Sequence, residues 1–558
     1  MHYAGCLPGT DVSPRVYSNP KVARAFSTSY LAGEPAACAF FAPAFRDPVQ
    51  RKQQAERAAG RQVPPALLDV LAEQQASLPA SPARQANLQA LAKGGTAVVA
   101  TGQQVGLFLG PLYTFYKAAS AVAVARAIEA ESGIRCVPLF WLQTEDHDFA
   151  EIQACALAGP DGQPVRLALD GGETQTRTSV AHRCLGPEIG ALLDQLATLL
   201  DGQPGAQEVL ALLREHYRFG RPLAAAFAGV LATLFADEGL LFLDPRDARV
   251  AAQAAPIYRT CIEQAGLIED QLRARQNALS AAGFATQVPV RSCALVFFHQ
   301  GGVDGPRFRL QQAADQRWGL TGSAEMLSQA ELLHWLAREP LRFSTSALLR
   351  PIVQDALLPT VAYVGGPGEI NYFAEIGPLY QHFQIAPPLL VPRARFRCLD
   401  ARTRRWLEQS GLRASDLFDP DFRAHLRPAR PAGSPNPQEM RDRVAQQILP
   451  VVQEITLAIS ATAKNLQRPA ERTRGSVAHA LERLLARYTH HLVERDEATQ
   501  GRIRKLELVL NPQGVAQERF YGWPWLAGRL GVSECKRLVL EQLAQSGAFT
   551  TEILELLP

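Results

Sequence analysis

The sequence predicts an α/β fold built on a parallel sheet, with two insertions and a C-terminal helical hairpin. Short apolar runs at 96–101, 135–142, 240–243 and 360–364 have the length of buried strands. An alanine-rich helical stretch at 112–131 separates the first two runs. Glycine or acidic residues follow each run, so the pattern of a buried strand and then a polar loop occurs several times along the chain.

The order of these runs predicts where a site would form. Crossovers between two strands of one sheet are almost always right-handed and make the strands parallel, so the loops after Thr101 and Leu142 open on one edge. The runs that end before Asp244 and Gly365 repeat this arrangement. Open α/β sheets bind ligands outside the carboxyl ends of their strands. We therefore expect an active site where these loops converge.

Length and composition restrict the class of protein. At 558 residues the chain exceeds what one core usually organises, so we expect a large α/β body and at least one further module. Hydrophobic residues make up 47% and charged residues 20%, as in globular proteins. The net charge is 57 − 54 = +3, with basic and acidic residues interspersed. We expect no nucleic-acid partner.

Targeting and redox features favour a soluble cytoplasmic enzyme. The longest nearly apolar run, 223–236, is too short to cross a bilayer, and Met1–Thr10 lacks a basic segment followed by an apolar one. The nine cysteines are odd in number and show no CxxC spacing. We expect reduced thiols and no membrane partner.

Changes in pattern predict four parts. They are an N-terminal helical layer at 1–93, a core at 94–400 with insertions at about 159–205 and 300–340, a helical hairpin at 401–510, and a helical segment at 511–558 packing back on the core. Within the hairpin we expect two long helices from 438 to 510, broken near 467–469. Apolar residues of the second helix form one seam: Val477, Leu481, Leu484, Tyr488 and Leu492. This seam either mediates a homodimer or packs only within the hairpin.

The first candidate loop, Thr101–Pro111, joins a strand to a helix and is neither a GxGxxG nor a Walker loop. Its glycines would let backbone amides approach a ligand, and a helix that begins after Pro111 favours an anion. Lys117 near the helix start strengthens that expectation, although its head could instead reach solvent. The candidate substrate- or anion-binding residues are Thr101, Gly102, Gln103, Gln104, Gly106, Gly110, Tyr113 and Lys117.

The second candidate loop places Glu145, Asp146 and Asp148 around His147. Neighbouring carboxylates favour imidazolium and desolvation opposes it, so His147 is a candidate acid/base group, with the three carboxylates as its catalytic partners. A Mg²⁺ site is also conceivable, because hard cations take carboxylate oxygens. The alternative is a solvated acidic turn that caps the next helix. No second His or Cys stands at zinc-ligand spacing.

The third candidate element combines buried charge with a glycine turn. Charged and polar side chains interrupt an apolar stretch before the 360–364 run, and buried charges persist only with partners, so we expect a polar network. The turn after that run lets Glu369 begin a helix at the same edge, although a helix N-terminal acid is the plain alternative. The candidate binding residues are Arg350, Gln354, Asp355, Gly365, Gly366, Gly368, Glu369 and Asn371.

Four segments together resemble bacillithiol synthase, the cysteine ligase family BshC. They are TGQQVGLFLGPLYTFYK at 101–117, PLFWLQTEDHDFAEI at 138–152, LLRPIVQDALLPTVAYVGGPGEINYFAEIGPLY at 348–380 and NPQGVAQER at 511–519. Their order and spacing also fit, so the resemblance spans most of the chain from about residue 94.

The resemblance implies a Rossmann-like core with two connecting insertions and a coiled-coil hairpin that mediates homodimerisation. It also implies an amide-forming ligase that adds L-cysteine to glucosaminyl-malate, the last step of bacillithiol synthesis. ATP or ADP is then the expected activating nucleotide, although no HIGH or KMSKS signature is present. A dimeric scaffold whose sheet pocket binds a nucleotide or metabolite as a regulatory ligand is the alternative function.

Overall fold

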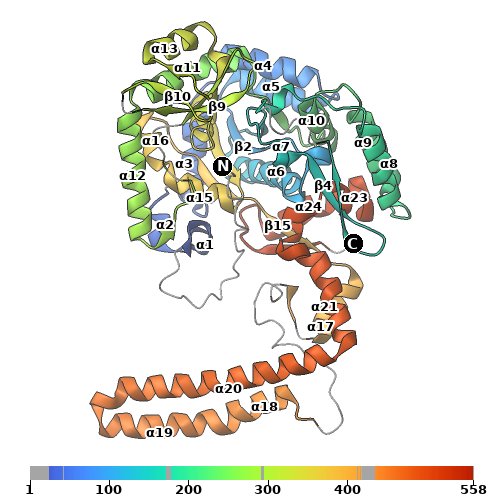
Figure 1. Ribbon diagram of the computed structural model, residues 1–558, viewed down its shortest axis with the longest axis vertical. Coiled ribbons are helices and arrows are strands. Elements are labelled where there is room, and N and C mark those ends of the chain that lie inside the picture. The colour runs from blue at the N-terminus through green and yellow to red at the C-terminus, as the bar shows by residue number, and fades with distance from the viewer. Residues whose placement is uncertain are drawn as a thin grey trace. The chain divides into compact units, whose positions relative to one another are not determined.

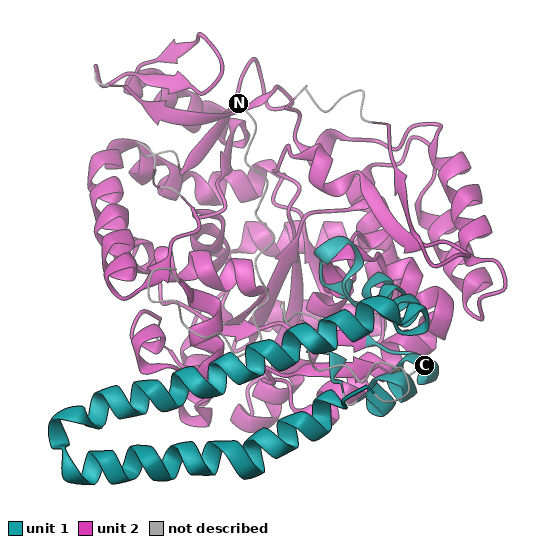
Figure 2. Cartoon of the chain, turned by 60° about the horizontal axis from the view of Figure 1, so that its bottom comes forward, with its two compact units in different colours: residues 1–16, 398–517, 557–558 teal, residues 17–397, 518–556 magenta. Residues whose placement is uncertain are grey.

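The computed structural model describes residues 24–41, 43–170, 177–288, 290, 295–313, 315–410, 412–414, 416 and 434–556. The expectation for Met1–Thr10 lies outside these residues, as do two of the nine cysteines expected to be reduced, Cys6 and Cys293. The chain divides into two compact units, shown in Figure 2. The larger unit comprises 17–397 and 518–556, and the smaller one comprises 398–517 with the two chain ends, 1–16 and 557–558.

A five-stranded parallel sheet with the order β14–β13–β2–β3–β6 forms the centre of the larger unit (Figure 1). Its strands are β2 (Ala97–Gln103), β3 (Cys136–Leu142), β6 (Leu241–Leu243), β13 (Thr360–Gly365) and β14 (Leu389–Pro392). The four strands expected from the apolar runs are confirmed. Their side chains are almost entirely buried, because helices cover both faces of such a sheet.

Helix α6 (Leu112–Ser132) is the crossover between β2 and β3, and it packs on both strands. It begins directly after Pro111 and ends at Gly133, whose φ of 72° closes the helix in the left-handed region. The small alanine side chains allow close packing, so most of the first half of the helix is buried. Lys117 is therefore carried into the protein interior rather than to solvent.

Helices precede the sheet and surround it. The N-terminal helices are α1 (Phe26–Ala32), α2 (Pro35–Cys38), α3 (Pro48–Ala59), α4 (Pro65–Ala76) and α5 (Pro82–Lys93). Four of the five begin with proline, which fits the first helical turn because no amide there needs a partner. The later helices are α11 (Ala248–Glu263), α12 (Ala265–Ala281), α14 (Arg350–Leu357), α15 (Pro367–Glu375), α16 (Gly377–His382), α22 (Gln517–Phe520), α23 (Trp523–Leu530) and α24 (Val532–Ser546).

Two insertions leave the sheet. The first contains α7 (Phe149–Ile152), the antiparallel pair β4 (Ala154–Ala158) and β5 (Pro164–Ala168), η2 (Val180–His182), α8 (Ile189–Leu200), α9 (Ala206–His216) and α10 (Leu223–Leu234). The second is a five-stranded sheet, β11–β10–β9–β8–β12, whose neighbours pair antiparallel where the register is defined. Its elements are β8 (Val296–His299), β9 (Arg307–Gln312), β10 (Trp318–Leu320), β11 (Met326–Leu327), α13 (Gln329–Arg338), η3 (Pro340–Arg342) and β12 (Phe343–Thr345).

Four short strands and one 3-10 helix are the other described elements of the larger unit and its border. The strands are β1 (Arg24–Ala25), which pairs with β7 (Phe284–Ala285), and β15 (Arg395–Cys398), which pairs with β16 (Ile553–Leu556). The 3-10 helix is η1 (Leu107–Leu109). One cluster of buried apolar side chains runs from the N-terminal helices through the parallel sheet to the second insertion.

The smaller unit is helical, and Figure 2 shows its long hairpin. Its elements are α17 (Ala401–Ser410), α18 (Pro437–Arg443), η6 (Val444–Ile448), α19 (Leu449–Thr462), η7 (Lys464–Leu466), α20 (Gln467–Arg495), α21 (Glu497–Leu510) and η8 (Pro512–Gly514). The break between the two long helices therefore lies just before the expected 467–469. Pro469 does not interrupt α20, because it lies in the first turn of that helix, where proline is tolerated.

The hairpin leaves much of its apolar surface uncovered. Leu485 and Leu492 of α20 are buried, whereas Leu484, which belongs to the expected seam, is 63% exposed. No residue of α19 is buried. Among the described residues one helical stretch, Pro437–Thr462, is long and apolar enough by length and composition to cross a membrane.

Candidate active site

Side-chain contacts join the three candidate loops at the carboxyl edge of the sheet. The Lys117 ammonium lies 2.5 Å from the Glu369 carboxylate, which connects the first loop to the third. Gln104 Nε2 donates to Asp146 Oδ2 at 2.8 Å, which connects the first loop to the second. Thr101 Oγ1 also donates to the Val364 carbonyl at 2.8 Å. The expected convergence of the loops is confirmed.

The two outer strands bring further residues to this edge. Asp244 follows β6 and accepts a hydrogen bond from the Thr144 hydroxyl of the second loop. At the other side Arg393 follows β14, and its backbone amide donates to the Gly365 carbonyl at 2.9 Å. All five strand ends therefore contribute to one region.

The glycines of the first loop permit close packing. A Cβ atom on Gly102 would lie 2.9 Å from the Trp141 carbonyl oxygen, and Gly110 has a φ of 62°. The backbone amides of Gly106, Leu109, Gly110 and Leu112 all donate hydrogen bonds within the protein. These four amides are therefore not offered to an anion, contrary to what the glycine spacing suggests.

Two adjacent non-glycine residues of this loop have strained backbones. Phe108 and Leu109 have φ values of 50° and 71°, and both are fully buried. The Tyr217 hydroxyl accepts from the Leu109 amide and donates to the Gly106 carbonyl, both at 3.3 Å. Tyr217, at the end of α9, thus holds the loop in a conformation that would otherwise relax.

Lys117 uses all three of its ammonium hydrogens. Besides Glu369, its Nζ donates to the Gly102 carbonyl at 2.7 Å and to Gln103 Oε1 at 3.0 Å. Burial lowers the pKa of Lys117, although Glu369 opposes that shift. Burial likewise opposes ionisation of Glu369, but Lys117 outweighs it and the carboxyl pKa falls. The pair is a buried ion pair that fixes two loops together.

A chain of buried hydrogen bonds continues inward from Glu369. The Tyr363 hydroxyl donates to Glu369, and Arg350 Nη2 donates to the Tyr363 hydroxyl at 3.0 Å. Arg350 Nη1 then donates to Gln354 Oε1 at 2.9 Å, and Gln354 Nε2 donates to Asp355 Oδ1 at 3.0 Å. The expected polar network exists, and it places Gln354 and Asp355 deep in the protein.

Only some residues of the third candidate element lie at the carboxyl edge of the sheet. The Gly366 amide donates to Glu369 Oε2 at 2.8 Å, so this turn shapes the Glu369 position. Asn371 instead accepts a hydrogen bond from the Ser27 amide of α1 at 2.7 Å. Asn371 therefore anchors the N-terminal helices to α15.

Arg307 of the second insertion organises the acidic loop. Its Nη1 donates to Asp146 Oδ1 at 3.1 Å and to His147 Nδ1 at 3.0 Å. Its Nε donates to Ser344 Oγ at 3.0 Å. Burial opposes ionisation of Asp146, but Arg307 and the hydrogen bond from the His147 backbone amide outweigh it, so the pKa of Asp146 is lowered. Sequence reasoning missed Arg307, because nothing local connects β9 to the acidic loop.

His147 is a neutral ring with a defined tautomer. Burial lowers its pKa to about 4, and Arg307 acts in the same direction. Because a guanidinium can only donate, Nδ1 must carry the lone pair, and the proton of the neutral ring lies on Nε2. The ring therefore offers a hydrogen-bond donor to the site.

The remaining acids of the second loop have different surroundings. Glu145 is buried and accepts hydrogen bonds from the Thr345 amide and hydroxyl, and burial raises its pKa. Asp148 is exposed and makes no side-chain capping bond to α7. Glu151, one turn further, has a pKa raised by desolvation, with Asp146 and Asp148 adding to the shift. Among the described residues no group of three or more His, Cys, Asp or Glu side chains is placed to hold a metal ion.

Tyr113 lies close to two arginines that are absent from the candidate residues of the sequence. The Arg393 and Arg519 guanidinium carbons lie 5.5 and 5.7 Å from its ring centroid. Arg393 makes a two-point ion pair with the buried Glu518, at 2.8 and 2.7 Å. Gln103 Nε2 donates to the Tyr113 hydroxyl at 3.4 Å. Arg393 could have been found as a charge directly after a strand, and Glu518 and Arg519 lie in the matched segment 511–519.

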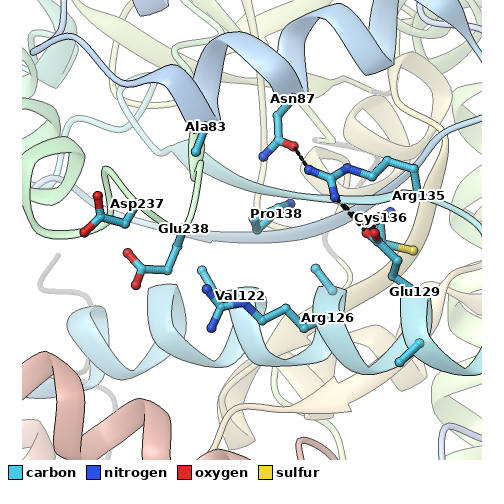
Figure 3. Close-up of a pocket in the computed structure, with 12 residues that line it drawn as sticks. Ala83, Asn87, Val122, Arg126, Glu129, Arg135, Cys136, Pro138, Asp237 and Glu238 are labelled. Atoms are coloured by element: carbon cyan, nitrogen blue, oxygen red, sulfur yellow. Dashed lines mark hydrogen bonds and ion pairs between the residues drawn. The ribbon is translucent and has the colours of Figure 1, made fainter.

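A separate cavity of about 390 Å³ lies at the opposite end of β3. Figure 3 shows that Asn87, Glu129 and Arg135 form one hydrogen-bonded wall, with Arg126 and Glu238 on another side. Arg135 Nη2 donates to Asn87 Oδ1 at 2.7 Å, and its Nη1 lies 3.0 Å from Glu129 Oε1. Cys136 begins β3, so this cavity is at the amino edge and does not share the loop cluster.

Comparison with known proteins gives a consistent result. Residues 16–394 match the family model described as "Bacillithiol biosynthesis BshC, N-terminal Rossmann-like domain". A protein of Koribacter versatilis named "Putative cysteine ligase BshC" is 33% identical over 83% of this chain and 85% of its own length. Proteins of the same name from Salinibacter ruber and Solibacter usitatus are 31% and 32% identical, over 83% and 80% of this chain and 84% and 82% of their own lengths.

The structure and these comparisons agree on the fold. The matched region contains the parallel sheet, both insertions and the three candidate loops. The matched regions also cover more than four fifths of the length of each of these three relatives, so the similarity extends beyond a single shared domain. The chain therefore belongs to the BshC family of bacillithiol biosynthesis.

Proposed function

We propose that this protein is a ligase that joins the carboxyl group of L-cysteine to the amino group of glucosaminyl-malate. The observation that carries this proposal is the meeting of the Gln104, Asp146 and Glu369 loops at one sheet edge. The relatives named as cysteine ligases support the type of reaction. Such a site brings hydrogen-bond donors, carboxylates and arginines together, as a reaction between an amine and a carboxylate requires.

The reaction forms an amide and removes one carboxylate oxygen. Because a carboxylate is a poor electrophile, it needs activation, and ATP is the proposed source. A phosphoryl or nucleotidyl group would take the departing oxygen, while the attacking amine loses a proton to a base. Amide nitrogen, carbonyl carbon and leaving oxygen are then all accounted for.

We assign roles to the loop residues from their contacts. The Nε2–H group of His147 would donate to the oxygen that gains negative charge when the amine attacks. Asp146 is held by Arg307 and Gln104, so it orients the loop rather than moving a proton. Asp148 and Glu151 are the carboxylates that would bind the substrate ammonium and accept its proton.

The glycine loop and the arginines differ in how well they could bind the phosphates of a nucleotide. Three amides of the loop and the Leu112 amide just after it donate hydrogen bonds within the protein, so the loop does not fit a phosphate cradle. Arg393 and Arg519 fit an anion better, because their positive charge lies beside Tyr113 at the sheet edge. Mg²⁺, if used, would bind together with ATP or ADP, since Mg²⁺ is usually held by one or two carboxylates and by the phosphates of the substrate.

The test is product formation by the purified full-length chain. L-Cysteine, glucosaminyl-malate, ATP and Mg²⁺ are incubated with the protein, and bacillithiol is measured by mass spectrometry. A His147→Ala protein serves as the matched control, because it lacks the proposed donor. Absence of product with every nucleotide and metal combination would refute the ligase assignment.

We also propose a cytoplasmic homodimer that forms through the hairpin of the smaller unit. Ile448, Val451, Ile455 and Ile459 are all at least 42% exposed and recur at spacings of three and four residues. They form one apolar stripe along η6 and α19 that the hairpin itself does not cover. A second copy would cover it as a coiled coil.

A further inference from the structure

Charged groups of both signs lie around Tyr113 in the candidate active site. The Arg393 and Arg519 guanidinium groups lie within 5.7 Å of the centre of the Tyr113 ring. Glu151 acts electrostatically on the Tyr113 hydroxyl, and both Asp148 and Arg519 act on Glu151. A substrate that carries both an amine and an acid group would find a partner for each group here.

Glu518 holds two arginines close to Tyr113. Its carboxylate lies 2.7 Å from Arg393 and 3.5 Å from Arg395, and Arg519 also acts on it electrostatically. The neighbouring Lys117 and Glu369 neutralise each other.

Arg519 is the member of this group that can reach a ligand. It is exposed, and it makes no hydrogen bond or ion pair to the part of the chain that the structure describes. The Arg393 guanidinium is only 2% exposed as a side chain and both of its terminal nitrogens are bound to Glu518. Arg393 therefore has a structural role in the site, whereas the N–H groups of Arg519 are available to a ligand.

The Tyr113 hydroxyl adds a second donor beside Arg519. Burial raises its pKa to about 12, so the hydroxyl keeps its proton at neutral pH. It accepts from Gln103 at 3.4 Å, so its own hydrogen can be donated to a ligand. A guanidinium with a neighbouring hydroxyl is well suited to the oxygens of a carboxylate or phosphate.

We propose that Arg519 and Tyr113 form an oxyanion subsite, which binds a carboxylate or phosphate group of the substrates while Asp148 or Glu151 binds the amine. The inference rests on the proposed ligase function and adds the orientation of the substrate. A dicarboxylic acid linked to an amino sugar, and a nucleotide, are the two sources of such an oxyanion.

The experiment measures binding by calorimetry to the full-length protein, without turnover. The probes are L-malate, inorganic pyrophosphate and glucosamine, so that carboxylate, phosphate and amine are examined separately. The variants are Arg519→Gln, Arg519→Lys and Tyr113→Phe. Arg537→Gln is the matched control, because Arg537 is an exposed arginine that pairs only with Glu534 and Glu541 on its own helix.

We expect Arg519→Gln to weaken binding of malate or pyrophosphate by about tenfold or more, with Arg519→Lys intermediate and glucosamine unchanged. Tyr113→Phe should weaken the same probe by less. Whichever of the two anions responds identifies the source of the oxyanion. Thermal unfolding of each variant shows that the fold is kept, which is expected because Arg519 is exposed.

Two results would overturn the subsite. Either neither anion binds to the unmodified protein at millimolar concentration, or Arg519→Gln binds both within twofold of the original affinity. Product formation decides the ligase function separately. An active enzyme with unchanged anion binding in Arg519→Gln would refute the subsite alone, and a binding effect in a protein without ligase activity would refute the function alone.

Discussion

Arg307 Nη1 donates a hydrogen bond to His147 Nδ1 at 3.0 Å, and this contact fixes which proton His147 carries. An arginine of the second insertion thereby determines the chemistry of a loop that lies 160 residues earlier in the chain. The neighbouring carboxylates alone would favour a charged ring. Burial and Arg307 together reverse that preference.

The first prediction concerns the protonation of His147. Because its pKa is lowered to about 4, the ring should stay neutral with its hydrogen on Nε2 throughout pH 5–8. The stability from burying the neutral ring should be complete above pH 6.5 and lost as the pH falls toward 4. Nitrogen NMR of histidine-labelled protein measures both properties, and His147→Asn assigns the signal. A ring that titrates near pH 6.5 would contradict the assignment.

The second prediction concerns the buried pair Lys117 and Glu369. Lys117→Met leaves Glu369 buried without its cation, so unfolding should cost about 3–5 kcal/mol less, and activity should be lost. Adding Glu369→Gln should restore part of the stability, because the unpaired charge is removed. Chemical denaturation of both single variants and the double variant measures the coupling. Lys52→Met on the exposed side of α3 is the control, and strictly additive effects would disprove the pairing.

The third prediction concerns acid stability and Glu518. Burial opposes its ionisation, but Arg393 and the nearby arginines lower its pKa to about 2. The ion pair should therefore stabilise the protein fully above pH 4.5 and progressively less as the pH falls toward 2. The Glu518→Gln substitution should lower the free energy of unfolding by about 3 kcal/mol or more at pH 7. In denaturation curves its deficit should shrink below pH 4, and a deficit that is independent of pH would contradict the lowered pKa.

The fourth prediction concerns Tyr217 and the strained loop. Tyr217→Phe keeps the ring that packs against Phe108 but removes the hydroxyl bonds to Gly106 and Leu109. The loss of stability should be modest, about 1–2 kcal/mol, whereas kcat should fall more steeply because the loop relaxes. Steady-state kinetics and thermal unfolding separate the two effects. Tyr488→Phe in the hairpin is a matched hydroxyl deletion, and equal kinetic losses in both variants would argue against a specific role.

The fifth prediction concerns the apolar stripe of α19. Ile455→Lys should convert a dimer into a monomer, since a charge in a buried apolar contact is strongly unfavourable. Leu457→Lys, on the opposite side of the same helix, should leave the dimer intact. Light scattering after size-exclusion chromatography reports the mass. A monomeric unmodified protein would exclude the proposed interface.

The sequence by itself determined the parallel sheet and the edge at which its loops meet. Strand-length apolar runs and the alanine-rich crossover at 112–132 are local signals, and the handedness of crossovers then leaves one arrangement. The same rule predicts from the sequence that the acidic loop around His147 and the helix that carries Lys117 lie at one edge of the sheet. Family likeness pointed to the same segments.

Tertiary structure decided what those residues do. The partner of Lys117 is Glu369 and the partner of His147 is Arg307, and each contact spans more than 150 residues of chain. Ionisation and tautomer depend on burial and on charges from distant elements, which no local pattern contains. The same reason explains why Arg519 was missed: its position beside Tyr113 exists only after the C-terminal segment returns to the end of the sheet.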